Sequence, residues 1–240
     1  MKFLGLFHYL LRASLALSTL SLASAALAQS VQTEEWISYR SAYKLMLQFE
    51  KYGKPKHLLQ NHLQLLNNQA QPFAEGQLSL QAKTLQMSLQ VDALGRVRLP
   101  LLKLAYDENA ELRLATQNQG LQLRLSLALA LPYEGHYEAS QLKSACEQAL
   151  NFYVSVGDRR GVQKRCSGIV MVYPQNLKVI PPYLKFENGQ LSVLTNAENG
   201  PNLETGVKPQ FAYFVKFSGL NDKTQVVSHH APLAVFPVME

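Results

Sequence analysis

Apolar and polar residues alternate most regularly between Leu121 and Leu131, where every second residue is leucine. Alternation with a period of two predicts a β-strand that has one buried face and one solvated face. Leucine is not a preferred strand residue, so here the pattern outweighs the propensity. Weaker alternation marks many shorter strands, and short strands separated by turn residues are typical of an antiparallel sandwich or barrel. The shorter predicted strands are 59–65, 78–82, 85–91, 97–100, 112–114, 169–173, 183–186, 190–194, 211–217, 226–227 and 233–238.

Two stretches change to the helical period. In the first, 33–51, apolar residues beginning with Trp36 recur on one face, and Thr33 is the expected N-cap. We interpret this aromatic stripe as core, with a ligand-stacking shelf as the alternative. In the second, 138–154, Cys146 lies on the apolar face. The predicted fold class is therefore α+β, mainly antiparallel β-sheet or sandwich with two packed helices.

The first 28 residues have the pattern of a secretory leader. Lys2 and Arg12 precede an apolar run, and the tripeptide Ala26–Ala28 offers the small residues that signal peptidase accepts. We predict cleavage after Ala28 and export to a bacterial periplasm. An uncleaved membrane anchor is the alternative, which Arg12 disfavours because it interrupts the apolar run. A lipoprotein is not expected, because residue 29 is Gln rather than Cys.

The predicted organisation has three parts. The leader, 1–28, precedes an N-terminal helix with a β-rich region, 29–135, and then a second helix with a β-rich region, 136–240, in the same or an adjoining core. The chain has 23 Lys and Arg against 17 Asp and Glu. The leader holds two of the basic residues and no acid, which leaves 21 against 17. This excess of positive charge is small compared with the basic stripe of a nucleic-acid binder, so no nucleic-acid partner is expected. The expected partners are another envelope protein or an anionic envelope surface.

The chain contains two cysteines, Cys146 and Cys166. In an oxidising compartment, two cysteines that close a short loop predict a disulfide. A catalytic thiol and half of a metal site are the alternatives. A redox pair more often has CxxC spacing, and the chain has no further cysteine for zinc.

Inside the loop that this disulfide would close lies the main concentration of basic residues. These candidate contacts for an anion or an acidic partner are Arg159, Arg160, Lys164 and Arg165. A tethered basic loop could bind lipid phosphates. The alternative is a solvated turn with no partner.

Motifs that carry chemistry do not stand out in this sequence. It has neither a G-x-S-x-G nucleophile elbow nor a glycine-rich phosphate loop. The spacing of the histidines that follow the leader is not that of a zinc site. We therefore predict no catalytic, cofactor-binding or metal-binding residues and no cofactor. The histidines considered are His57, His62, His136, His229 and His230.

Two segments carry a resemblance to known proteins. Asp92 to Pro100 has the form D-x-x-G-x-x-x-L-P, and a serine- and proline-containing ending runs from Val227 to Pro237. With the leader and the aromatic-bearing helix, these segments resemble a proteobacterial periplasmic family of unknown function. The first segment is also similar to the turn of transthyretin-like and carboxypeptidase-regulatory-like sandwiches, which are accessory modules without catalytic residues. The resemblance implies an exported, β-rich, non-enzymatic protein and transfers no functional residue.

Three functional hypotheses follow. The leading one is a non-catalytic accessory or binding module of the cell envelope, acting through a sheet face, a loop or a strand edge. The others are a hydrolase of envelope polymers, whose site only the fold assembles, and a carrier of an apolar ligand. A pocket with convergent histidines or carboxylates would favour the enzyme, and a dry apolar cavity would favour the carrier. A packed core with an exposed apolar patch would favour the module.

Overall fold

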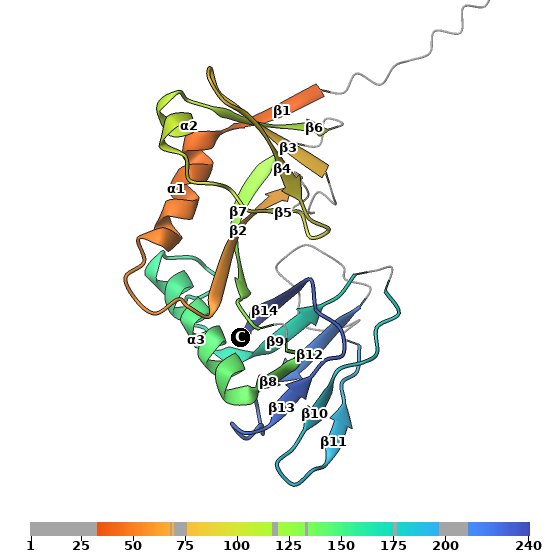
Figure 1. Cartoon of the computed structure of the whole chain (residues 1–240). Coiled ribbons are helices and arrows are strands. Elements are labelled where there is room, and N and C mark those ends of the chain that lie inside the picture. Colours follow the sequence, from red (N-terminus) through yellow and green to blue (C-terminus); the bar gives the residue numbers. More distant parts are fainter. Residues whose placement is uncertain are drawn as a thin grey trace, which may run out of the picture. The chain divides into compact units, whose positions relative to one another are not determined.

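A computed structural model describes residues 33–67, 69, 76–116, 120–132, 134–174, 177–196 and 211–240 (Figure 1). The predicted leader and most of the loop that the sequence predicts before residue 210 lie outside these residues. The described chain belongs to one unit, Gln32–Glu240. It consists mostly of antiparallel sheets with two long helices and one short helix, which confirms the predicted α+β class.

The described strands form four sheets in which neighbouring strands pair antiparallel. Their orders are β1-β6-β3-β4, β5-β2-β7, β12-β9-β14 and β11-β10-β13-β8. The bounds of the strands are β1 Thr33–Ser38, β2 Leu59–Leu66, β3 Gly76–Gln81, β4 Gln86–Val91, β5 Arg96–Val97, β6 Glu111–Thr116, β7 Gln122–Leu129, β8 His136–Glu138, β9 Cys166–Val172, β10 Tyr183–Lys185, β11 Leu191–Val193, β12 Ala212–Lys216, β13 Gln225–Val227 and β14 Ala234–Met239. The helices are α1 Tyr39–Glu50, α2 Lys103–Asp107 and α3 Ala139–Ser155.

The first predicted helix begins later than the sequence suggested. Thr33–Ser38 is strand β1, which pairs with β6 along its whole length, and Ser38 rather than Thr33 is the N-cap of α1. Trp36 is therefore not on the core face of a helix, and its side chain is 60% exposed. The prediction was wrong here because pairing with a strand more than seventy residues away decided the conformation, whereas helical spacing is a local signal. The second predicted helix is confirmed as α3.

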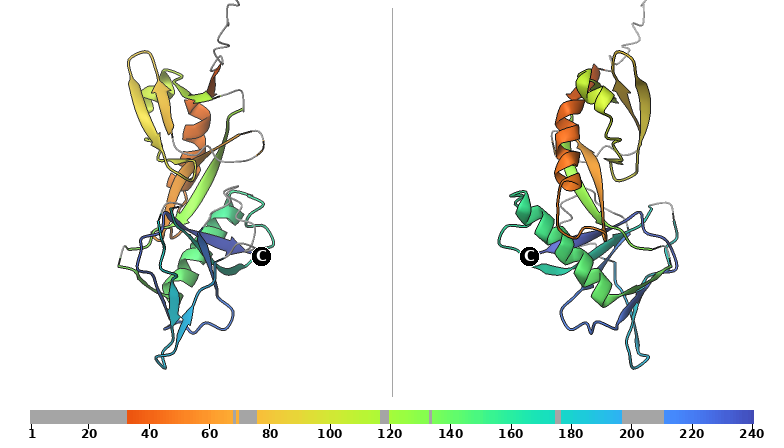
Figure 2. Two further views of the ribbon diagram at one scale, coloured as in Figure 1. Left: turned by 90° about the vertical axis from the view of Figure 1, so that its right-hand side faces the viewer. Right: turned by 60° about the vertical axis from the view of Figure 1, so that its left-hand side comes forward.

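Strands β2 and β7 form a continuous two-stranded ribbon that runs from Leu59↔Leu129 to Leu66↔Gln122. One face of the ribbon is made of leucines, and these enter the larger hydrophobic core together with residues of α1 and α3. That core contains side chains from both of the predicted regions, 29–135 and 136–240. Figure 2 shows α1 and α3 beside the ribbon, and α3 also packs on β9 and β14.

The second face of this ribbon corrects a prediction. Alternating leucines predicted a solvated opposite face in β7, but Ser126 and Ala128 are buried there, as is Gln64 on β2. The turn between β4 and β5 contributes hydrogen bonds to this face, since Gln64 Nε2 donates to Leu94 O at 2.9 Å. Ala128 belongs to a second, smaller core with residues of β9, β12 and β14. This face is therefore covered around Gln64, Ser126 and Ala128, while Gln122 at its end is exposed.

Candidate binding surface at the end of α3

The predicted disulfide joins α3 to β9. Cys146 lies on the buried face of the helix and is fully buried, and Cys166 is the first residue of β9. The structure confirms the bond between them, with Cα atoms 6.0 Å apart. Helix α3 ends at Ser155, and Gly157 follows with φ 67°, a left-handed conformation that glycine adopts without strain. The disulfide therefore encloses the end of the helix and the loop 156–165.

Inside this loop, Asp158 and Arg160 form a compact turn. Oδ1 of Asp158 accepts hydrogen bonds from the backbone N–H and from Nε of Arg160, both at 2.9 Å, and Oδ2 accepts one from Nη2 at 2.6 Å. The guanidinium also lies over the Tyr153 ring, 4.2 Å from its centroid. Burial would raise the pKa of Asp158, but the hydrogen bonds from Arg160 outweigh it and the pKa is lowered.

Arg160 therefore differs from the other basic residues of the loop. Its side chain is only 15% exposed and is engaged in the turn, so its role is structural. Arg159, Lys164 and Arg165 are exposed. Lys164 Nζ lies 3.4 Å from a backbone oxygen of β14, a long contact at the surface. The sequence predicted four equivalent cations, and the fold leaves three of them on the surface.

The loop is held in place at several points. The backbone N–H and C=O of Arg165 both hydrogen-bond to Glu240, at 2.9 and 3.0 Å. Gly161 lies so close to α3 that an added Cβ would stand 2.8 Å from the Cβ of Tyr153, which only glycine avoids. With the disulfide and the Asp158 turn, these contacts present the cations on a fixed backbone.

Three exposed aliphatic side chains accompany the exposed cations. Val154 is 52% exposed, Val156 37% and Val162 47%. We call the set that they form with the three cations the basic–apolar surface: Val154, Val156, Arg159, Val162, Lys164 and Arg165. Sequence reasoning missed the valines. Val154 directly follows the buried Tyr153 on the helix, so its exposure could have been derived from helical geometry.

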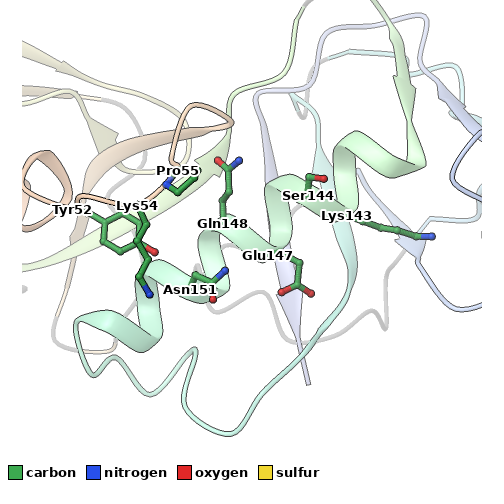
Figure 3. A pocket seen from close by; sticks show the side chains of 8 residues that line it. All are labelled: Tyr52, Lys54, Pro55, Lys143, Ser144, Glu147, Gln148 and Asn151. Carbon is green, nitrogen blue, oxygen red and sulfur yellow. The ribbon is translucent and has the colours of Figure 1, made fainter.

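A groove of about 420 Å³ lies next to this surface, along the exposed side of α3 (Figure 3). The α1–β2 connection brings Tyr52, Lys54 and Pro55 to the C-terminal part of α3. The Tyr52 ring packs edge-on against Phe152, with centroids 5.3 Å apart, and its buried hydroxyl has no hydrogen-bond partner among the described residues. The helix side of the groove consists of Lys143, Ser144, Glu147, Gln148 and Asn151.

Two polar side chains of the groove are engaged in the fold. Gln148 Oε1 accepts a hydrogen bond from the Leu58 N–H at 3.1 Å, and Lys143 Nζ bonds Asp222 Oδ1 at 2.7 Å. Asn151 and Val154 are three residues apart and share a side of α3. The exposed side of α3 thus continues from the groove into the basic–apolar surface, and Lys54 contributes a cation to the groove near Asn151 (Figure 3).

One titratable side chain, His62, lies half-buried in the β2–β7 ribbon. His62 lies on the polar face of β2, where burial first and then the charge of Arg96 lower its pKa to about 4. Its Nδ1 atom is buried without a hydrogen-bond partner in the described part of the chain. Within the described ranges, no three or more His, Cys, Asp or Glu residues come together in a way that could hold a metal ion.

A second hollow lies near the polar face of the ribbon. It measures about 40 Å³, and its walls include Gln60, Arg96 and Tyr137 together with residues 232–235. Small-molecule pockets usually measure ~300–1,000 Å³, so this hollow has room for a few waters at most. Among the described helices, none is both long and apolar enough to span a bilayer.

Comparisons with known proteins leave the family open. No protein-family model matches the chain, and no curated protein or solved structure gives a match. The resemblance to a periplasmic family and to transthyretin-like sandwiches therefore stays a prediction from the sequence.

Proposed function

We propose that this protein is an exported, non-catalytic binding module of the cell envelope, which attaches to an anionic envelope component through the basic–apolar surface. One observation carries the proposal: three exposed valines and three exposed cations lie within residues 154–165, at the last turn of α3 and on a loop whose backbone is fixed at both ends. Exposed aliphatic side chains that are not scattered singly are typical of interaction sites.

The packing of the interior supports a module over a carrier. The larger core contains fully buried side chains from every part of the described chain, among them Tyr39, Leu63, Leu142 and Met171. The small hollow beside Arg96 is polar on one side and far below the size of a ligand pocket. An apolar ligand would therefore have to displace packed core side chains at this point, at a cost of stability.

Fractionation of cells that produce the chain with its own leader would test the proposal. We expect a mature protein that begins at Gln29, carries an oxidised disulfide and sediments with envelope membranes at low salt. High salt should release it, because exposed charges are screened over about 10 Å at 0.1 M. The variant Arg159→Glu/Lys164→Glu/Arg165→Glu should stay in the soluble periplasmic fraction.

The matched control changes the net charge by the same amount, but at residues outside the loop. Lys83, Lys178 and Lys185 are exposed and lie outside the disulfide loop, so Lys83→Glu/Lys178→Glu/Lys185→Glu should sediment as the wild type does. If both triple variants sediment equally well, the loop does not attach the protein to the envelope and the proposal is wrong.

A further inference from the structure

We infer that the component bound by the basic–apolar surface is an anionic phospholipid bilayer, with Val154, Val156 and Val162 entering the interface beneath the phosphates. The inference rests on the proposed function and names the partner of the same surface. It starts from the composition of that surface, in which each exposed cation lies within a few residues of an exposed valine.

The valines favour a bilayer over a soluble polyanion. A soluble polyanion would pair with Arg159, Lys164 and Arg165 but would leave the aliphatic side chains in water. A bilayer offers phosphates and, a few ångströms deeper, acyl chains, so it satisfies both kinds of side chain at once. Juxtaposed cations and aliphatic side chains are the pattern of interfacial binding segments.

The fixed backbone of the loop favours the same partner. The disulfide, the Asp158–Arg160 turn and the pairing of Arg165 with Glu240 hold the loop before it meets any partner, so little conformational entropy is lost on binding. Arg160 is turned inward and paired with Asp158, which neutralises the carboxylate of that turn, whereas the exposed Glu240 remains beside Arg165 as an acidic neighbour.

The surroundings limit the contact to the end of α3. Lys54 reaches the same end from the α1–β2 connection and adds a cation (Figure 3). Glu147, the acidic residue of the groove, is seven residues before Val154, which is about 10 Å along the helix. The bilayer is therefore expected to meet the last turn of α3 and the loop, while Glu147 stays in the water layer.

Vesicle flotation with the purified, oxidised mature chain tests the inference. We expect binding to vesicles that mix phosphatidylglycerol with phosphatidylcholine, and little binding to pure phosphatidylcholine. Each Lys or Arg near such a surface contributes roughly fivefold to partitioning, so Arg159→Gln/Lys164→Gln/Arg165→Gln should lower the partition coefficient about 100-fold.

The valines are tested without any change of charge. Val154→Gln/Val156→Gln/Val162→Gln should lower partitioning by about tenfold or more, whereas the matched triple Ile180→Gln/Leu191→Gln/Val193→Gln should leave it unchanged. The control residues are more exposed than the valines, at 54%, 58% and 65%, and lie outside the loop. Far-UV circular dichroism would show that both variants fold.

The depth to which residue 162 enters the bilayer can be measured directly by tryptophan fluorescence. In a Trp36→Phe/Val162→Trp variant, lipids brominated on their acyl chains should quench the tryptophan emission, and soluble polyphosphate should not shift it. The Trp36→Phe/Val193→Trp variant is the control and should not be quenched.

The outcomes separate the inference from the proposed function. Retention on envelope membranes without binding to phosphatidylglycerol vesicles would overturn the inference and leave the proposed function standing. Equal vesicle binding by the wild type and by Val154→Gln/Val156→Gln/Val162→Gln would also overturn the inference and leave the proposed function standing, because it would indicate a general polyanion site. Loss of both envelope retention and vesicle binding in the wild type would overturn both.

Discussion

Two turns of this molecule use one arrangement of side chains in different surroundings. In each, an aspartate accepts a backbone N–H and a guanidinium, and the arginine also lies over an aromatic ring. Asp92 and Arg96 form the first turn, with Arg96 5.6 Å from the centroid of Phe236. Asp158 and Arg160 form the second, beneath the ring of Tyr153.

The two turns differ in what lies beyond the ion pair. Arg96 is 6% exposed, and its Nη2 donates to the carbonyl of Leu233 at 2.9 Å, so the first turn joins the β4–β5 region to the segment before β14. For Arg160, the ion pair described above lies within its own loop and the ring contact is with Tyr153. The same arrangement therefore stabilises the tertiary fold at one place and a local surface loop at the other.

The largest effect is expected at the buried turn. Arg96→Met removes the partner of Asp92 and the donor to Leu233. Asp92 is 37% exposed, so solvent screens part of its charge, and the loss should lie at the lower end of the range for buried pairs, at about 3 kcal/mol or slightly more. Urea unfolding measures the loss. Asp92→Asn is the milder companion, because the amide oxygen still accepts the backbone N–H groups. A loss below about 1 kcal/mol for Arg96→Met would show that the turn is not a tertiary link.

The disulfide supports the surface turn, and its removal is expected to cost slightly less. Cys146→Ala/Cys166→Ala opens a loop of 20 residues, which corresponds to about 3 kcal/mol in the chain-entropy model. Urea unfolding of this variant against the oxidised wild type measures the change. An unchanged midpoint would mean that the remaining contacts of the loop suffice.

The pH dependence of stability probes the surroundings of the buried turn, because Arg96, Asp92 and Arg98 all act on His62. Its pKa is near 6.5 in the unfolded chain and about 4 in the fold. The unfolded state therefore binds the additional proton between these values, and stability falls as the pH falls. Between pH 7.5 and pH 5 the loss should be about 2 kcal/mol.

His62→Gln is the matched variant for this titration. It should flatten the stability profile between pH 7.5 and pH 5 in urea unfolding. The lowered pKa of Asp158 acts only at more acidic pH and so does not contribute in this window. A variant profile as steep as that of the wild type would assign the titration to another group.

The smallest effects separate two adjacent arginines. Arg160→Ala should cost about 1–2 kcal/mol, because it removes the ion pair and the packing on Tyr153. Arg159→Ala should stay within about 0.5 kcal/mol, as expected of an exposed side chain without a structural role. Thermal unfolding of both variants gives the comparison. Equal losses would contradict the distinction between a structural and a free arginine.

Much of the fold could be predicted because its signals are local. Alternating leucines located β7, the apolar face of 138–154 located α3, and the inward position of Cys146 on that face agreed with its bond to Cys166. Each of these signals depends on neighbouring residues only. The periodicity within each segment was therefore sufficient to locate these two elements and the inward position of Cys146.

The errors and omissions depend on partners that are distant in the sequence. Thr33–Ser38 is a strand because β6 is beside it. Part of the second face of the ribbon is buried because the turn after β4 and the second core cover it. The candidate surface shows the same limit. The sequence located the basic loop, but which of Arg159 and Arg160 turns inward is decided by Asp158 and the ring of Tyr153.

The hydrogen bond from Arg96 to Leu233 spans 137 residues and has a consequence for the time course of folding. Because such distant contacts form only after a large loss of chain entropy, folding should be slow compared with that of helical domains of this size. A nascent chain that has not yet exposed residue 233 lacks the acceptor for Arg96. We therefore expect the ribbon of β2 and β7 to stay only partly protected from hydrogen exchange until almost the whole chain has been synthesised.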